Sequence, residues 1–336
     1  MGPGSDKHGP MGSGPAGAAP VGSGLAGAAP GLKRVVVLLA SYNGLAWLPE
    51  QLDSILSQTG VELEVVVSDD VSTDGTWQWW QERAAADDRL RLLPQPPATL
   101  GSARNFYRLL DEIDVQHGDL VALADQDDVW LPGKLASQVQ LLASGAVDGV
   151  SSNVTAFGAD GSRVLLRKDW PQRRFDFLCE GPGPGCTFVL SARLVRQVQE
   201  LLRDPGGAAR SVDFHDWLIY GVCRASGWTW SISSSPTVDY RQHDSQALGA
   251  HLGLRQTRHR LGLVRASWHR DQARAMAAVA LEVAPPEARA ALERMHGLFA
   301  DRRTSSRVRL VLRAPLLRRR PRDRMAIAML VAAGLW

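Results

Sequence analysis

Carboxylates are crowded on one short segment, Asp125-Gln126-Asp127-Asp128, which follows an apolar run that predicts a strand at 120–124. Side chains of this kind repel one another and raise each other's pKa unless a cation compensates their charge. Hard divalent cations such as Mg²⁺ and Mn²⁺ bind carboxylate oxygens together with the phosphates of a substrate. The segment therefore indicates a site for a diphosphate held by Mg²⁺ or Mn²⁺. A solvated acidic turn is the alternative, and the position after a buried strand argues against it.

Two other predicted strands end in polar segments of the same type. The strand at 35–39 is followed by Ser41-Tyr42-Asn43, and the strand at 64–67 by Ser68-Asp69-Asp70. Because ligands of open α/β sheets bind outside the carboxyl ends of the strands, the three segments are expected to converge on one site. Ser72 and Asp74 are equally compatible with turns and helix caps, in which such residues are common.

The elements that must position these residues follow from periodicity. Up to residue 124, strands are predicted at 35–39, 64–67, 92–93 and 120–124, separated by helices at 45–56, 73–86 and 102–113. This alternation predicts an α/β fold with a mixed, mainly parallel sheet flanked by helices. Beyond residue 150, the predicted strands are 150–156, 187–190, 228–232 and 237–240, and the predicted helices are 192–202 and 213–225.

In combination, the polar segments resemble the signature of family 2 glycosyltransferases with the GT-A, Rossmann-like fold. The matching motifs are Ala40-Ser41-Tyr42-Asn43, Ser68-Asp69-Asp70-Val71-Ser72-Thr73-Asp74-Gly75 and Asp125-Gln126-Asp127-Asp128-Val129-Trp130. Three further motifs are similar to the bacterial rhamnosyltransferase-like branch of this family: Gly185-Cys186-Thr187-Phe188, His215-Asp216-Trp217 and Tyr240-Arg241-Gln242-His243. The resemblance covers about residues 33–250.

The resemblance implies inverting transfer of a sugar from a nucleoside-diphosphate donor to a hydroxyl of a glycan, glycolipid or other acceptor, with Mg²⁺ or Mn²⁺ as cofactor. It suggests dTDP-L-rhamnose as the donor, while a UDP-sugar stays open because no residue decides between them. Carried over by position, the residues implied to bind the donor are Ser41, Tyr42, Asn43, Asp69, Asp70, Asp125, Gln126, Asp127 and His243. Asp127 and His243 are also the implied metal ligands, and Asp216 is the implied catalytic base.

The residues of the second half also have structural interpretations. Asp216 in the first turn of a helix would interact favourably with the positive helix N-terminus, and Asp213 is expected to be the N-cap. His215 is compatible with an outer position in the site and with a purely structural role. Arg241 and His243 alternate to one face of a predicted strand, which suits an anionic phosphate.

The same half of the chain contains a segment rich in glycine and proline and three cysteines. Gly181-Pro182-Gly183-Pro184-Gly185 is too rich in proline to cradle a phosphate and is predicted to be a mobile loop beside the acceptor. The three cysteines, Cys179, Cys186 and Cys223, have neither the even number of a disulfide framework nor the spacing of a zinc site. We therefore expect buried, reduced thiols.

Composition divides the chain into three parts. Residues 1–31 are almost entirely Gly, Ala, Pro and Ser, which cannot bury enough apolar surface to fold, so disorder is predicted. Residues 32–250 form the expected GT-A domain. Residues 251–336 form an expected helical, basic C-terminal extension, with a break at Pro285-Pro286.

The extension carries a strong charge asymmetry. Residues 301–324 contain ten arginines and two aspartates, a local charge of +8, although the whole chain has a net charge of only +3. Such asymmetry indicates an anionic partner. Residues 325–336 are apolar but too few to span a bilayer, which takes about twenty residues, so an interfacial helix on anionic lipid is expected. A helix pair that forms a dimer and a solvated basic helix are the alternatives.

Two other function classes share the nucleotide-binding α/β pattern. A sugar nucleotidyltransferase would need a Gly-rich, basic phosphate loop after the first strand, which Ser41-Tyr42-Asn43-Gly44 lacks. A nucleotide-sugar-binding scaffold or an inactive relative would lack acidic residues at the site, whereas all are present. The sequence therefore predicts a metal-dependent glycosyltransferase, cytoplasmic or peripheral at the inner face of the plasma membrane, with no nucleic-acid partner.

Overall fold

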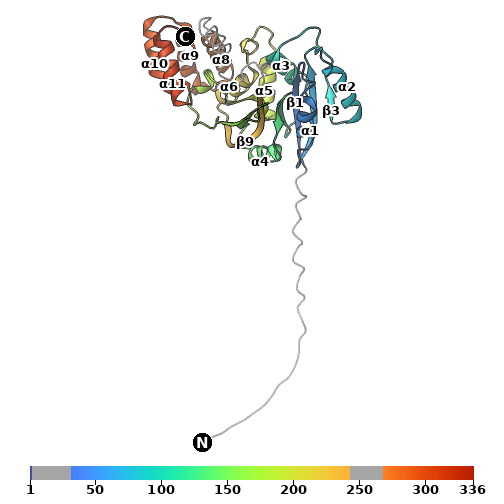
Figure 1. Cartoon of the computed structure of the whole chain (residues 1–336). Coiled ribbons are helices and arrows are strands. Elements are labelled where there is room, and N and C mark those ends of the chain that lie inside the picture. The colour runs from blue at the N-terminus through green and yellow to red at the C-terminus, as the bar shows by residue number, and fades with distance from the viewer. Residues whose placement is uncertain (2–31, 243–267) are drawn as a thin grey trace. The chain divides into compact units, whose positions relative to one another are not determined.

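The computed structural model describes Met1, residues 32–242 and residues 268–336, and the described residues from 32 onward form one compact unit. The predictions for residues 2–31, and for His243 as a donor and metal ligand, lie outside the described residues. Figure 1 shows the whole chain.

A nine-stranded mixed sheet lies at the centre of the described part (Figure 1). Its strands, in spatial order β3-β2-β1-β4-β8-β6-β9-β5 with β7 on β6, are β1 (Lys33–Ser41), β2 (Val61–Asp69), β3 (Leu90–Leu92), β4 (Leu120–Asp125), β5 (Val129–Trp130), β6 (Gly149–Gly158), β7 (Arg163–Leu166), β8 (Val189–Ser191) and β9 (Trp230–Gln242). β1 is parallel to both β2 and β4, whereas β8 is antiparallel to β4. The predicted α/β fold with a mixed sheet is confirmed.

Helices pack on the sheet, and four further helices follow its last strand in the described part of the chain. The α-helices are α1 (Leu48–Leu56), α2 (Thr76–Ala86), α3 (Ser102–Asp111), α4 (Lys134–Ala143), α5 (Ala192–Leu202), α6 (His215–Ala225), α8 (Trp268–Val283), α9 (Pro286–Ala300), α10 (Thr304–Leu317) and α11 (Pro321–Ala332). Short 3₁₀ helices are η1 (Asp176–Leu178), η2 (Gly185–Thr187) and η3 (Ala208–Ser211). Among the described helices, none combines the length and the apolar character needed to cross a membrane.

The continuous apolar run of β1 is explained by burial on both faces. Val36 and Leu38 belong to the core shared with α3, α5 and α6, whereas Val35 and Val37 belong to the core shared with α1 and α4. Because successive side chains of a strand point to opposite faces, a strand between two helical layers needs apolar residues at every position. The middle of β1 is therefore apolar throughout, and the polar residues begin where the strand ends.

The structure corrects several boundaries. The strands predicted at 228–232 and 237–240 are one strand, β9, whose pairing with β6 shifts register between Ser152 and Val154. The periodicity did not predict α4, β5 or β7. Asp213 is not the N-cap of α6, because that position is Phe214. The Asp213 carboxylate instead accepts a hydrogen bond from the indole of Trp268 in α8, at 2.6 Å.

The C-terminal helices share the core of the sheet domain. α8 packs against α6 and η3, and its residues Ala273, Met276 and Ala277 are fully buried in the cluster that also contains α3 and α5. Gly221 in α6 allows this approach, since a Cβ there would lie 2.5 Å from the sulfur of Met276. The predicted break is confirmed, because α8 ends at Val283 and α9 begins at Pro286.

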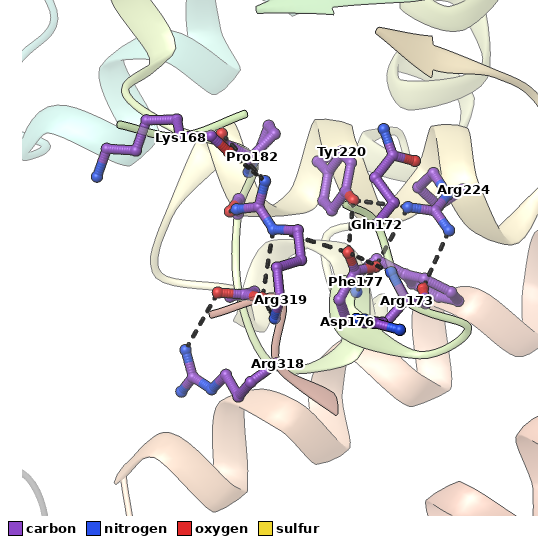
Figure 2. A network of polar contacts seen from close by, with 12 residues as sticks. Lys168, Gln172, Arg173, Asp176, Phe177, Pro182, Tyr220, Arg224, Arg318 and Arg319 are labelled. Atoms are coloured by element: carbon purple, nitrogen blue, oxygen red, sulfur yellow. Dashed lines mark hydrogen bonds and ion pairs between the residues drawn. The ribbon is translucent and has the colours of Figure 1, made fainter. Parts of the chain in front are cut away.

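Arg319, between α10 and α11, joins the extension to the sheet domain through polar contacts (Figure 2). Arg319 is only 5% exposed, and its guanidinium donates hydrogen bonds to the carbonyls of Lys168 (3.1 Å), Gly181 and Pro182. It also forms ion pairs with Glu180 and Asp176, at 3.3 and 3.7 Å. The Gly-Pro segment predicted as a mobile loop is thus anchored by a residue more than 130 positions away in the sequence.

We predict that Arg319→Met lowers the free energy of unfolding by about 3 kcal/mol, because three carbonyls and two carboxylates lose a buried donor. Urea denaturation measures this change. Arg322→Met is the matched control, since Arg322 lies in the first turn of α11 and its side chain is 69% exposed. Equal stability of the two variants would contradict the anchoring role of Arg319.

Candidate functional site

The three polar segments meet at the carboxyl edge of the sheet, as predicted. The register pairs Ser41 with Asp69 across β1 and β2, and Ala40 with Asp125 across β1 and β4. The ends of three neighbouring parallel strands therefore lie side by side, and the loops that follow them form one edge.

Gln126 ties the first of these loops to the last. Its amide oxygen accepts the peptide N–H of Tyr42 at 2.7 Å, and its amide nitrogen donates to the carbonyl of Tyr42 at 2.9 Å. Gly44 leaves room for this side chain, because a Cβ there would lie 2.2 Å from the Gln126 amide oxygen. The amide of Gln126 is thus hydrogen-bonded within the protein, while Tyr42 is 48% exposed.

Backbone strain is concentrated in the first two loops. Asn43 (φ 49°) and Val71 (φ 63°) are the non-glycine residues with positive φ in the described ranges. This conformation is unfavourable for the β-branched Val71, and residues held in this way cluster at functional sites. Asn43 is held by Ser72 and Thr73, because its peptide N–H donates to Ser72 Oγ and its Oδ1 accepts the Thr73 N–H, each at 2.8 Å.

Asp69 and Asp70 shape the second loop. The Asp69 carboxylate accepts hydrogen bonds from Ser41 Oγ (3.1 Å), the Ser72 peptide N–H (3.0 Å) and Gln95 Nε2 (2.6 Å). The Asp70 carboxylate accepts the peptide N–H groups of two residues just before α3, Leu100 (2.7 Å) and Gly101 (2.8 Å). Both acids are buried at the predicted site, and each is bound by the protein itself. Asp74 fits the capping alternative, since its Oδ1 accepts the Thr76 N–H at the start of α2.

The acidic segment after β4 holds charge that the protein compensates only in part. Burial raises the pKa of Asp125 to about 7, and the charges of Asp127 and Asp216 add to the shift. Burial also raises the pKa of Asp128, with Asp127 and Asp125 contributing. Asp128 Oδ1 accepts the Arg241 N–H at 3.1 Å, whereas its buried Oδ2 has no hydrogen-bond partner among the described residues.

These acids fit a cation. Asp125, Asp128 and Cys186 each offer an atom within 4.8 Å of the others, a different set from the Asp127 and His243 that the resemblance assigns. Burial raises the pKa of the Cys186 thiol, so the sulfur stays neutral and unsuited to a hard cation. The carboxylates, with one unpartnered buried oxygen, are therefore the groups that a divalent cation would stabilise.

Arg241, a residue of β9, links the acidic segment to that strand. Its Nε donates to the carbonyl of Asp127 at 2.8 Å, and its guanidinium pairs with Glu50. Next to it, β5 pairs with β9 through Val129 and Asp239. Arg241, expected on a phosphate-facing side of the strand, thus has partners within the protein.

Asp216 lies at the start of α6, close to the acidic segment. Burial raises its pKa to about 6, although the Trp217 N–H at 2.7 Å and the nearby Lys168 lower it. The influence of Asp216 on the pKa of Asp125 places the two carboxylates near each other. Gly185 of η2 packs against this turn, where a Cβ would lie 3.5 Å from the Asp216 Cβ. The structure therefore brings the implied base to the same site as the acidic segment.

His215, beside Asp216, is a neutral buried ring. It stacks on Phe106 of α3 with 3.8 Å between ring centroids, and burial lowers its pKa to about 3. Its Nε2 has no hydrogen-bond partner within residues 32–242 and 268–336. Of its two interpretations, the stacking favours a structural support for the Asp216 turn. The three cysteines are free and buried, as expected.

Sequence reasoning missed Lys168 and Arg319. Burial lowers the pKa of Lys168, and the charges of Arg319 and Arg320 add to this effect, whereas Asp216 opposes it. Lys168 is therefore close to the implied base. No local pattern marks it, because it lies in an irregular segment after β7 and outside every motif.

Comparison with known proteins agrees with this geometry. The family model described as glycosyl transferase family 2 matches residues 36–199. The dTDP-rhamnosyl transferase RfbG of Shigella flexneri is 34% identical over 235 residues, which cover 70% of this chain and 81% of that protein. An Escherichia coli protein named UDP-Glc:alpha-D-GlcNAc-diphosphoundecaprenol beta-1,3-glucosyltransferase WfgD is 26% identical over 161 residues, or 47% of this chain and 60% of WfgD.

A solved structure is similar in fold. Residues 1–349 of TarS from S. aureus, in complex with UDP-GlcNAc, superpose with a TM-score of 0.54 at 15% identity, over 89% of this chain and 81% of that chain. At this identity the similarity concerns the fold alone.

Proposed function

The chain belongs to glycosyltransferase family 2 and has the fold of a nucleotide-sugar glycosyltransferase, and on this premise we propose that it transfers L-rhamnose from dTDP-L-rhamnose to an acceptor hydroxyl. The observation that carries the proposal is the position of Asp216, whose carboxylate lies beside the acidic segment that would hold the donor's diphosphate. The similarity to RfbG, named for dTDP-rhamnose, supports the donor. The similarity to WfgD supports an acceptor linked to a lipid through diphosphate.

We assign the donor to the edge formed by β1, β2 and β4. The nucleoside would lie along the loops that contain Ser41, Tyr42, Asn43, Asp69, Asp70 and Gln126, with the diphosphate at Asp125 and Asp127. His243 remains part of this proposal through the family resemblance. The strain at Val71 supports the assignment, since strained backbone is retained where a ligand is positioned.

A Mg²⁺ or Mn²⁺ ion bound by Asp127, with Asp125 beside it, would neutralise the charge that develops on the leaving diphosphate. The raised pKa of Asp125 and the unpartnered oxygen of Asp128 support a cation, because both indicate negative charge that the protein leaves uncompensated. The assignment of His243 as a further ligand rests on the resemblance.

The displacement needs a base on the acceptor side, and Asp216 is suited to it. Oδ1 of Asp216 accepts the Trp217 N–H, while Oδ2 has no hydrogen bond to the residues that the structure describes. The acceptor hydroxyl would transfer its proton to Oδ2 as its oxygen attacks the anomeric carbon, and the bond from that carbon to the diphosphate oxygen breaks. A pKa near 6 keeps the carboxylate ionised at neutral pH and makes it a stronger base than an exposed Asp.

The donor prediction concerns binding. In a thermal-shift panel of nucleotide sugars with Mn²⁺, dTDP-L-rhamnose is expected to raise the melting temperature most, because a ligand stabilises the fold by mass action. Asp127→Ala is expected to abolish transfer and leave the melting temperature of the free protein unchanged. Full activity of this variant, or of the wild type in excess EDTA, would remove the metal from the proposal. A larger shift with a UDP-sugar would replace the donor.

The base prediction concerns turnover and pH. Asp216→Asn is expected to lower kcat by about 10² to 10⁴, the usual contribution of a general base, and to leave the KM for the donor unchanged. Because only ionised Asp216 accepts the proton, the kcat of the wild type should rise with pH through about 6 and level off above it. The variant should lose this acidic limb. Weaker donor binding with unchanged kcat would instead place Asp216 in the donor site.

We also propose that α10 and α11 contact an anionic membrane surface. Val308, Leu312 and Leu316 follow one face of α10 at intervals of four residues and are exposed, Leu312 by 73%. Met325 and Met329 are exposed on α11, which packs against α10. Exposed apolar residues beside arginines favour an interfacial position, and each arginine contributes on the order of 1 kcal/mol near anionic lipid.

Only some of the ten arginines within residues 301–324 are available to lipid. Arg318, Arg319 and Arg324 bind carboxylates or carbonyls within the protein. Arg309 is exposed, and Arg303 and Arg322 are exposed as well, with surface ion pairs to Asp301 and Asp323. The effective charge of the surface is therefore lower than the +8 counted along the sequence.

Liposome flotation tests the membrane proposal. At low salt the protein is expected to float with vesicles that contain phosphatidylserine or phosphatidylglycerol, and to be released as salt screens the arginines. Replacing Val308, Leu312 and Leu316 by Ser should abolish flotation. The control is Leu141→Ser, because Leu141 on α4 is also exposed, by 42%. A wild-type protein that stays with the unbound fraction would contradict the proposal.

A further inference from the structure

A polar pocket lies where the C-terminal extension meets the sheet domain. It has a volume of about 240 Å³ and is formed by the segment from Arg167 to Trp170, the segment from Glu180 to Gly183, and the turn from Arg319 to Asp323 at the start of α11. The anchoring of Arg319 to the first two segments fixes these walls relative to one another. The pocket therefore exists only because the extension is docked.

Two cations of this pocket have no partner within the described residues. The ammonium of Lys168 and the guanidinium of Arg320 form neither a hydrogen bond nor an ion pair there, whereas Arg167 pairs with Asp169 at 2.9 Å. The acids of the pocket are already paired, Glu180 with Arg319 at 3.3 Å and Asp323 with Arg322 at 3.4 Å. Two positive charges thus have no direct hydrogen bond or ion pair within the described residues, although Asp216 and Glu180 lie close enough to interact with Lys168.

Holding these two charges together is unfavourable in the free protein. Burial lowers the pKa of Lys168, and Arg320 adds to this effect, so the two cations are close enough to repel each other. An anion between them would replace this repulsion with two charge-assisted hydrogen bonds, and phosphate groups are well suited to Arg and Lys.

The pocket adjoins the base. Lys168 is near enough to Asp216 to lower its pKa, and Gly183 packs on Lys168, where a Cβ would lie 3.2 Å from Cγ. Figure 2 shows the Lys168 side chain running away from the Arg319 guanidinium, so its ammonium is not part of that network. An anion bound at Lys168 would therefore lie close to Asp216, on the side where the proposed function puts the acceptor.

We propose that Lys168 and Arg320 bind the diphosphate of a lipid-linked acceptor and so present its sugar hydroxyl to Asp216. This inference rests on the proposed function, which supplies the transfer and the acceptor side. The donor's own diphosphate belongs at the acidic segment, where it needs a cation, whereas this pocket supplies positive charge from side chains alone. The exposed apolar residues of α10 and α11 belong to the same extension as Arg320, which suits an acceptor with a lipid attached.

Calorimetric titration of inorganic pyrophosphate in EDTA tests the pocket, because EDTA removes metal-dependent binding at the donor site. Pyrophosphate is expected to bind the wild type, and Lys168→Gln and Arg320→Gln are each expected to weaken it by about tenfold or more, the value of a lost charged hydrogen bond. Arg322→Gln, next to the pocket and largely exposed, and Asp127→Asn should bind as the wild type does. No binding at millimolar concentrations, or a loss in Asp127→Asn alone, overturns the proposal.

Farnesyl diphosphate in detergent distinguishes an acceptor from a free anion. If the pocket takes a lipid-linked diphosphate, this ester binds at least as tightly as pyrophosphate and is weakened by the same two substitutions. Binding of pyrophosphate without the ester would overturn the acceptor assignment.

Two controls separate the possible failures. Both pocket variants should keep the melting temperature of the wild type to within a few degrees, since neither side chain has a partner to lose. They should also keep the thermal shift by dTDP-L-rhamnose and Mn²⁺, which reports on the donor site. If no nucleotide sugar shifts any of these proteins, the proposed function fails, while the titrations still decide whether the pocket binds diphosphate.

Discussion

Negative charge at the end of β4 is the constraint on which the site depends. Asp125, Asp127 and Asp128 follow one another closely at this strand end. The pKa values of Asp125 and Asp128 are raised, and Asp128 has a buried oxygen that lacks a hydrogen-bond partner in the described structure. Such crowding is compatible with a site for a cation and its ligand, because the bound cation offsets the repulsion between the carboxylates. The surrounding contacts fix the position of this acidic segment, since Gln126 links it to the first loop and Arg241 links it to β9.

The second half of the site has the opposite charge. The side chains of Lys168 and Arg320 form no hydrogen bond or ion pair among the described residues, and Lys168 is close enough to Asp216 for the two charges to interact. Asp216 is influenced by both groups, since Asp125 and Lys168 each interact with its carboxylate. In the proposed reaction, a divalent cation would hold the donor's diphosphate at the acidic segment, whereas the basic groups would attract the acceptor's diphosphate directly, so each substrate would have its own side of the base.

The C-terminal extension packs against the sheet domain and forms part of the pocket that we assign to the acceptor. Its first helix completes the apolar core over α6, and Arg319 anchors the Gly-Pro segment next to η2 and Asp216. The extension therefore contains both buried arginines that stabilise the fold and exposed arginines at the surface. Arg319, with buried partners, forms a wall of the pocket that we assign to the acceptor, and the exposed arginines belong to the surface that we propose contacts anionic lipid.

The sequence by itself determined the fold class and the convergence of the polar segments at the sheet edge to which we assign the donor. β-Branched runs and helical periodicity report burial, and the motifs after β1, β2 and β4 are contiguous, so their convergence follows from a parallel sheet. Only the tertiary structure decided that Asp213 binds Trp268 instead of capping α6, which arginines are buried, and that Lys168 and Arg320 share a pocket. These last two lie about 150 positions apart, and no local pattern encodes such a contact. Local periodicity records whether a residue is buried, whereas its partner is set by how distant elements pack.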